Sequence, residues 1–320
     1  MKKREIGTSG IAVTRLSFGG SSLASMPDTY GYEVDEARAK QTIEQVFAGP
    51  VTMLDTSRNY GMGRSEARIG EVIRQRGGLP EGFALATKLD RDMTTGHFDA
   101  SRARRSLEES LEALGLDRVP ILHLHDPEYA ADLETVTGSG GALEELFKIK
   151  QEGLADLVGL AMGRLDMMVP ILKDWPFDVL INHNRYTLLN RQADQMFDYA
   201  FDKGIGIFNA APFAGGVLAK GSSQVKRITY QDVDEEALAP VRAFESLCAE
   251  FSVDLGAVAL QFSMRDPRIT STIVGVSRPE SIERNLAWAK MEIPPAFWAQ
   301  LAQIPYSTDD PEANRVYKPD

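Results

Sequence analysis

Four polar side chains from three separate parts of the chain could carry out acid-base chemistry together. They are Asp55, Tyr60, Lys88 and His125. A free tyrosine has a pKa of about 10, too high for ready proton exchange near neutral pH. A lysine ammonium beside the phenol would lower this pKa, and an aspartate would keep that lysine charged and oriented. These residue types therefore predict a proton relay in which Tyr60 carries the proton, while His125 orients the same substrate oxygen or shares the transfer.

Each of these residues alone also has a purely structural interpretation. Asp55 could form a turn or cap a helix, and Tyr60 could be a half-buried aromatic residue. Lys88 could end a strand in solvent, and His125 could be a hydrogen-bonded core residue. Taken together they favour a site, because a buried lysine is costly unless a partner such as an aspartate on the next strand compensates its charge. No zinc site is predicted, since His123 and His125 lack helical ligand spacing and no cysteine joins them.

Short apolar segments precede these residues and predict the strands that position them. They recur at roughly regular spacing along the whole chain, and each ends in turn residues. The predicted strands are Leu16 to Phe18, Thr52 to Leu54, Ala84 to Thr87, Ile121 to Leu124, Leu157 to Leu160, Val179 to Ile181, Ile205 to Phe208, and Thr272 to Val276.

Amphipathic segments between the strands predict helices, for example over Asp35 to Phe47, Ser65 to Gln75 and Asp99 to Leu114. Eight alternating units of this kind predict one (β/α)8 barrel domain over residues 1–320. An N-terminal hairpin is expected from Lys3 to Ile6 and from Ile11 to Thr14. An open doubly wound sheet is the alternative, although Gly19-Gly20-Ser21-Ser22 is not the GxGxxG pattern that such a sheet would carry after its first strand.

Two long insertions follow predicted strands, at Ala24 to Val34 and at Ala211 to Val233. In a barrel, loops that follow strands lie on the catalytic face. The segment from Pro305 to Asp320 contains Tyr306 and Tyr317. It is either a flap over that face or a frayed tail.

The composition limits the class of protein. The 320 residues are 43% hydrophobic and carry a net charge of −11, which argues against a nucleic-acid partner. Cys248 is the only cysteine, so no intrachain disulfide can form. The N-terminal residues predict no signal peptide, and no stretch reaches the roughly 18 apolar residues of a membrane span. A cytoplasmic location is expected, and the oligomeric state is left open.

Three segments of the sequence resemble the signature segments of the aldo-keto reductase family, in the right order and spacing. They are Leu54-Asp55-Thr56-Ser57-Arg58-Asn59-Tyr60-Gly61, Ala86-Thr87-Lys88 and Leu124-His125-Asp126-Pro127. The resemblance implies a (β/α)8 barrel with a catalytic tetrad of Asp55, Tyr60, Lys88 and His125. It also implies NADP or NAD as the hydride carrier, bound across the barrel mouth without a Rossmann unit.

Two further segments resemble that family's dinucleotide-binding loops. Residues 211–218 are similar to the loop that wraps the pyrophosphate, and residues 275–285 are similar to the adenosine-binding segment. In the second segment a helix N-terminus offers amides to phosphate, and Arg278 could pair with a 2′-phosphate, which favours NADP. The cofactor-binding residues expected on this basis are Gly19, Gly20, Asp55, Asn182, Ala211, Phe213, Gly215, Leu218, Gly275, Ser277, Arg278, Ser281 and Asn285.

The sequence departs from the family pattern where the nicotinamide would lie. The usual Ser-Asn after the fifth strand is Ala161-Met162, and the Tyr that often stacks on the nicotinamide is Ala210. The usual Gln after the sixth strand has Asn182 or His183 as its nearest match. In the adenosine segment the usual Lys is Gly275, so the preference for NADP rests on Arg278 alone.

The substrate class follows only from a finer resemblance. The segment Asn184-Arg185-Tyr186-Thr187-Leu188-Leu189-Asn190 and the form His125-Asp126-Pro127 are similar to the aldose and galactose dehydrogenase branch of the family. This implies oxidation of a sugar at its anomeric carbon to a lactone, with Tyr60 accepting the hydroxyl proton. Three alternatives stay open: NADPH-dependent reduction of aldehydes or ketones, a regulatory barrel that binds the dinucleotide without catalysis, and a phosphate-handling barrel enzyme.

Overall fold

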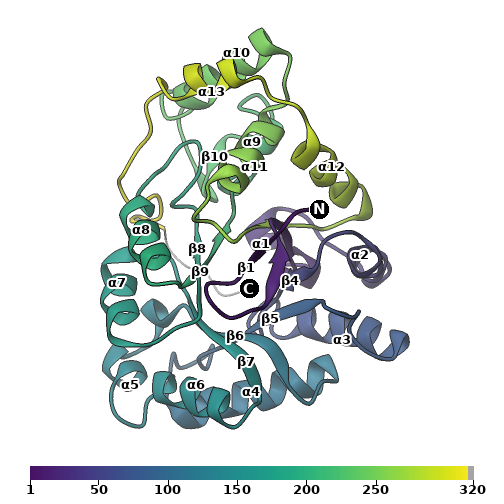
Figure 1. The fold of residues 1–320 in the computed structure, drawn as a ribbon, viewed down its shortest axis with the longest axis vertical. Coiled ribbons are helices and arrows are strands. Elements are labelled where there is room, and N and C mark those ends of the chain that lie inside the picture. Colours follow the sequence, from purple (N-terminus) through teal and green to yellow (C-terminus); the bar gives the residue numbers. More distant parts are fainter. Residues whose placement is uncertain (316–320) are drawn as a thin grey trace.

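A closed barrel of eight parallel strands forms the centre of the protein, as the computed structural model of residues 1–315 shows (Figure 1). The strand order is β12-β3-β4-β5-β6-β7-β8-β9. These strands are β3 (Leu16–Gly19), β4 (Met53–Asp55), β5 (Ala84–Leu89), β6 (Val119–His125), β7 (Ala155–Ala161), β8 (Val179–His183), β9 (Gly206–Ala210) and β12 (Ser271–Gly275). The predicted barrel is confirmed. The open-sheet alternative is wrong, because β12 pairs with β3 in parallel and leaves no sheet edge.

The barrel interior is filled by alternate residues of the strands, since side chains two positions apart share a face. The part of the interior away from the carboxyl ends of the strands is apolar and includes Met53, Ile121 and Phe208. The predicted hairpin, β1 (Lys3–Glu5) and β2 (Ala12–Thr14), adds Ile6 and Val13 to the same cluster. Both side chains are fully buried, so the hairpin closes the end of the barrel opposite the carboxyl ends of the strands.

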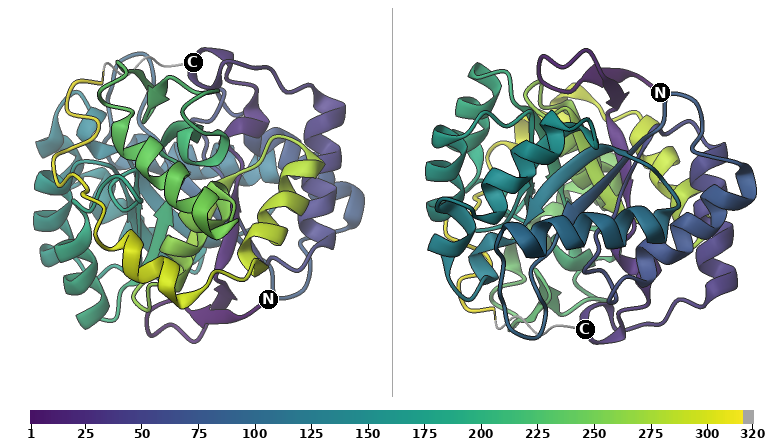
Figure 2. Two further views of the ribbon diagram at one scale, coloured as in Figure 1. Left: turned by 90° about the horizontal axis from the view of Figure 1, so that it is seen from above. Right: turned by 90° about the horizontal axis from the view of Figure 1, so that it is seen from below.

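Helices surround the barrel in an outer layer (Figure 2). They are α1 (Pro27–Tyr30), α2 (Glu36–Ala48), α3 (Arg64–Arg76), α4 (Ala100–Leu114), α5 (Leu133–Thr137), α6 (Ala142–Gln151), α7 (Leu165–Asp174), α8 (Asp194–Asp202), α9 (Val217–Lys220), α10 (Ala239–Phe251), α11 (Leu255–Arg265), α12 (Pro279–Lys290) and α13 (Pro295–Leu301). The three helices for which the sequence predicted residue ranges are α2, α3 and α4, and each observed range agrees with the predicted one to within one residue at either end. Asp35 and Asp99 cap α2 and α4, because each side chain accepts a hydrogen bond from a first-turn amide at 2.8 Å.

The long loops carry short elements of their own. The first insertion contains α1, and the second contains α9 and a small ribbon, β10 (Arg227–Ile228) with β11 (Gln231–Asp232). Three 3₁₀ turns, Ser21–Ala24, Pro127–Tyr129 and Ala214–Gly216, follow β3, β6 and β9. Helices α9, α10, α11 and α13 enclose a separate apolar cluster, which holds this part of the molecule against the barrel.

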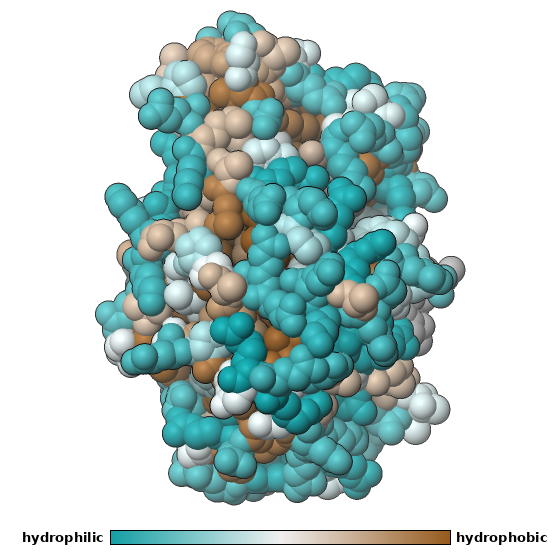
Figure 3. Space-filling view, turned by 90° about the vertical axis from the view of Figure 1, so that its right-hand side faces the viewer, coloured by the Kyte–Doolittle hydropathy of each residue, from teal (hydrophilic) through white to brown (hydrophobic). Residues whose placement is uncertain are grey.

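The face shown in Figure 3 is mainly hydrophilic, with small separate apolar areas. No single helix among residues 1–315 is long and apolar enough to cross a membrane. Helices α10 and α11 meet that criterion only as a pair, which bends by 99° at the break between them.

Candidate active site

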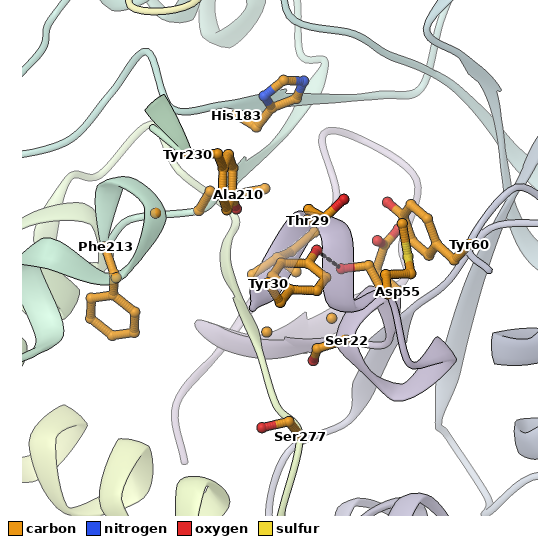
Figure 4. Close-up of a pocket in the computed structure, with 18 of the residues that line it drawn as sticks. Ser22, Thr29, Tyr30, Asp55, Tyr60, His183, Ala210, Phe213, Tyr230 and Ser277 are labelled. Carbon is orange, nitrogen blue, oxygen red and sulfur yellow. Dashed lines mark hydrogen bonds between the residues drawn. The ribbon is translucent and has the colours of Figure 1, made fainter. Parts of the chain in front are cut away.

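The last inward-facing residues of the eight strands form a ring at the carboxyl ends of the barrel. All of them line one cavity of about 610 Å³, which extends under the two insertions (Figure 4). The ring consists of Gly19, Asp55, Lys88, His125, Ala161, His183, Ala210 and Gly275. The four residues predicted to act together thus come together, with Tyr60 entering from the loop after β4.

Lys88 and Asp55 form a buried ion pair in this cavity. The Lys88 ammonium lies 2.8 Å from each oxygen of Asp55 and 2.5 Å from the backbone oxygen of Thr56. The side chains of Lys88 and Asp55 are only 2% and 7% exposed. Because both charged groups are removed from water, each compensates the charge of the other, and loss of either one would leave an unpaired charge buried in the barrel.

Tyr60 lies against this pair. Its hydroxyl is 3.2 Å from Lys88 Nζ, and the same ammonium lies 4.7 Å from the centre of its ring. The chain turns directly after Tyr60 at Gly61, which has a φ of 58°. A side chain at this position would collide with the backbone of Ala24. The pKa of Tyr60 is raised well above 10.0 by burial first and by Asp55 second. The expected net lowering of this pKa is therefore wrong, because burial, followed by the charge of Asp55, raises it despite the nearby Lys88 ammonium.

His125 has its own buried carboxylate, which comes from Asp90. His125 Nδ1 lies 2.6 Å from Asp90 Oδ1 and 3.1 Å from Ser57 Oγ. The imidazole meets the Tyr60 ring edge to face, with centroids 5.7 Å apart. Burial acts to lower the pKa of His125, but the charges of Asp126 and Asp90 outweigh it and raise this pKa above 6.5.

The opposite side of the cavity contains most of the residues expected to bind a dinucleotide. In Figure 4, Phe213 and Ser277 lie across the cavity from Tyr60. Ten of the expected cofactor-binding residues line the cavity as a whole: Gly19, Asp55, Ala211, Phe213, Gly215, Gly275, Ser277, Arg278, Ser281 and Asn285. Arg278 precedes α12 and makes no ion pair within residues 1–315. Burial, followed by the charge of Arg278, lowers the pKa of Arg284, a second cation on this wall.

The C-terminal segment lies against the same face through a cluster of charges. Glu312 accepts a hydrogen bond from Arg185 at 2.8 Å and lies 3.1 Å from His183 Nδ1. Arg315 donates to the other oxygen of Glu312 and lines the cavity, where it lies 5.0 Å from the Tyr230 ring centre. Among residues 305–315 of this segment, Arg315 is the one that lines the cavity, and Glu312 holds it there. Tyr306 is 53% exposed and does not line the cavity, and Tyr317 lies outside the described residues.

Comparison with known proteins identifies the group to which this barrel belongs. The model of the Aldo/keto reductase family matches residues 15–305. The chain belongs to the aldo/keto reductase family. It is 28% identical to a D-threo-aldose 1-dehydrogenase from Pseudomonas sp, over 92% of this chain and 94% of the relative. It is 30% identical to an L-galactose dehydrogenase from Arabidopsis thaliana, over 89% of this chain and 86% of the relative.

A solved structure shows the same fold. An aldo-keto reductase from Bacillus halodurans in its holo form superposes with a TM-score of 0.75, covering 98% of this chain and all of that one. At 21% sequence identity this likeness speaks for the fold alone. As an aldo-keto reductase, the protein is an NAD(P)-dependent oxidoreductase acting on small carbonyl or alcohol compounds.

Three residues expected to contact the cofactor of this aldo-keto reductase do not line the cavity. Asn182 follows the inward-facing Ile181 and so points outward, where its amide donates to the backbone oxygen of Met162 at 2.9 Å. Leu218 is fully buried in the cluster of α9, α10 and α11. Gly20 supports the wall from behind, since its amide donates to Asp55 O at 2.7 Å. Asn182 and His183 were the two nearest matches to the Gln that the family usually has after the sixth strand. Of these two, His183 lines the cavity.

The insertions contribute cavity residues that sequence reasoning did not name. Tyr30 from α1 bonds to Ser21 Oγ at 2.6 Å and meets the Tyr230 ring edge to face, with centroids 6.1 Å apart. These two rings join the first insertion to the second over the cavity (Figure 4). Asn184 and Asp126 also line it, but they follow β8 and β6 and belong to segments already quoted for the family resemblance. In the sequence, both insertions directly follow predicted strands. This position predicted that they lie on the catalytic face, but not which of their residues line the cavity.

Proposed function

We propose that this aldo-keto reductase oxidises an aldose at its anomeric carbon to the lactone, with NADP or NAD as the hydride acceptor. One observation carries the proposal. The Tyr60 hydroxyl, 3.2 Å from the ammonium of Lys88, lies in a cavity whose nearby wall is rich in hydrogen-bonding groups. The names of the two relatives, a D-threo-aldose 1-dehydrogenase and an L-galactose dehydrogenase, support the choice of a sugar.

The cavity offers suitable partners for a dinucleotide. Asn285 is 1% exposed, lines the cavity, and its Oδ1 has no hydrogen-bond partner within residues 1–315. Ser277 and Arg278 precede the N-terminus of α12, where free amides and a cation suit a phosphate. Gly215 and Gly216, with φ of 77° and 104°, keep the second loop open without side chains. When bound, the nicotinamide would supply the site for hydride uptake or release.

The proton chemistry falls to residues of this chain. In the oxidation, the substrate hydroxyl loses its proton to Tyr60 while the anomeric carbon loses a hydride, and a C=O bond forms. Lys88 stabilises the negative charge on the phenol oxygen, and Asp55 keeps Lys88 in place. His125, whose imidazole meets the Tyr60 ring edge to face with centroids 5.7 Å apart, orients the same reacting oxygen.

The wall beside Tyr60 suits a polyhydroxylated substrate. Asp126 presents a carboxylate, and Asn184 has an Oδ1 without a hydrogen-bond partner in the described part of the chain. His183 and Tyr30 add further polar atoms. Polar groups that are buried, as at Asn184, or partly buried, as at Asp126, favour a ligand that offers several hydroxyls and disfavour one that leaves them unpaired.

Reduction of an aldehyde or ketone is the second candidate function. The raised pKa of Tyr60 favours it, because burial and Asp55 keep the phenol protonated and ready to donate. Both directions use the same atoms, so the choice between them depends on the substrate and on the redox state of the nucleotide.

A spectrophotometric screen at 340 nm tests both candidates. Aldoses and small aldehydes are each run with NAD and NADP, in the oxidising and the reducing direction. We expect NAD(P)H formation with one or more aldoses and identification of the lactone among the products. Turnover confined to aldehydes with NADPH would refute the aldose proposal in favour of the second candidate. No turnover with any pair would refute both.

A further inference from the structure

A second buried carboxylate lies next to the proposed tetrad, and none of the tetrad roles includes it. Asp90 follows β5, two residues beyond Lys88, and its side chain is 2% exposed. Oδ1 accepts from His125 Nδ1 at 2.6 Å, and Oδ2 accepts from Ser57 Oγ at 2.6 Å and from the amide of Asn59 at 2.8 Å. Both oxygens are therefore engaged, and the carboxylate has one fixed orientation.

These contacts determine which nitrogen of His125 carries a hydrogen. An ionised carboxylate can only accept hydrogen bonds, so Nδ1 must be the donor to Asp90. Burial acts to raise the pKa of Asp90, but the charge and hydrogen bond of His125 outweigh it and hold this pKa below 3.8. Nε2 is left to meet the substrate, and it lies 3.6 Å from Asp126 Oδ2 in the cavity wall.

The charged and titratable groups around the ring come from several elements. They are Asp55 from β4, Tyr60 from the next loop, Lys88 from β5, Asp90 after it, His123 from β6, and Asp126 after that strand. Among them Asp90 alone makes a short hydrogen bond to the ring, at 2.6 Å. Removing it would leave Nδ1 with the Ser57 hydroxyl at 3.1 Å, which can donate or accept and so does not fix which ring nitrogen carries the hydrogen.

We propose that Asp90 is a positioning residue, which fixes the His125 ring with Nε2 toward the substrate oxygen and keeps a hydrogen on Nδ1. The site then contains two matched pairs from neighbouring strands: Asp55 holds Lys88, and Asp90 holds His125. This inference rests on the proposed role of His125 at the reacting oxygen, but not on which sugar is the substrate.

Asp90→Asn tests the proposal, because it keeps the shape and can offer an amide hydrogen to Nδ1. We expect kcat to fall about 10²-fold or more, as for other buried carboxylates that orient a catalytic histidine, with KM changed less than about threefold. The pH profile of kcat should also shift. The matched control is Asp92→Asn in the same loop, whose carboxylate accepts hydrogen bonds from Thr94 and Thr95 at the surface and does not contact His125.

A double-variant cycle separates positioning from a structural role. In a His125→Ala background, Asp90→Asn should cause no further loss of kcat, because its effect passes through the ring. An equal loss in both backgrounds would overturn the proposal. If Asp90→Asn does not fold, Ser57→Ala replaces it, since it removes one donor to Asp90, and it should give a smaller change of the same kind.

A measurement on the whole protein without substrate provides a readout independent of activity. The chain has 4 histidines, so an NMR titration can assign the His125 ring by comparison with His125→Ala. The pKa of His125 should fall in Asp90→Asn and stay unchanged in Asp92→Asn. An unchanged titration in Asp90→Asn would refute the inference. Absence of turnover in the wild-type protein would count against the proposed function, while the titration would still decide the role of Asp90.

Discussion

The Lys88 ammonium lies 2.8 Å from both carboxylate oxygens of Asp55, inside a barrel where neither group meets bulk water. Breaking a buried pair by removing one partner costs about 3–5 kcal/mol, because the other charge is left uncompensated. We expect Lys88→Met to lower the free energy of unfolding by this amount. Urea unfolding followed by circular dichroism measures it.

The double variant Asp55→Asn/Lys88→Met should recover most of that stability while remaining inactive. The control is Lys226→Met in the exposed pair with Glu235, which should cost no more than about 1 kcal/mol. A double variant as unstable as Lys88→Met would show that the lost charge pairing is not the cause.

Glu66 should make stability depend on pH. Its side chain is fully buried behind β5, and burial raises its pKa from 4.5 to about 7. The pKa of Glu66 is higher in the folded than in the unfolded protein. Its favourable contribution to the free energy of unfolding is therefore complete below about pH 4.5 and is lost as the pH rises through 7. Glu66→Gln should therefore raise the free energy of unfolding at pH 8 by on the order of 3 kcal/mol, and the gain should shrink toward pH 5.

Denaturant titrations at several pH values check this prediction. Glu71→Gln, an exposed position on the same helix α3, is the matched control and should show no such trend. A gain for Glu66→Gln that is independent of pH would contradict the assigned ionisation.

Arg278 should distinguish the two nucleotides. It lies at the start of α12 on the cavity wall and makes no ion pair within residues 1–315 that would compete for its charge. Arg278→Ala should weaken NADP binding about 10-fold or more, and NAD binding far less, because only NADP carries the 2′-phosphate. Lys290→Ala at the other end of α12 is the control. Equal losses for both nucleotides in a fluorescence titration would refute the assignment.

The fold could be predicted because it depends on patterns that are local in the sequence. Apolar segments, helix caps and the spacing between them define eight β/α units, and a two-residue period decides which side chains face inward. The same period could have excluded Asn182, which is out of phase with Ile181, and could have drawn attention to Asp90, which is in phase with Lys88.

Other parts of the site were beyond sequence patterns. Tyr30 and Tyr230 meet across the cavity because two long loops fold against each other, and no local signal encodes that contact. The pKa direction of Tyr60 was predicted wrongly for a similar reason. It depends on the balance between burial, Asp55 and Lys88, which only the three-dimensional distances determine.

The turnover of Tyr60→Phe, compared with its nucleotide affinity, tests the central claim most directly. The change removes one hydroxyl, 3.2 Å from Lys88 Nζ, and keeps the ring that packs against His125. We predict a loss in kcat of about 10²-fold to 10⁴-fold, the usual contribution of a positioned acid or base, with the Kd for NADP or NAD within about twofold of wild type. A variant with a kcat within about tenfold of wild type would contradict the role of Tyr60 as the proton carrier.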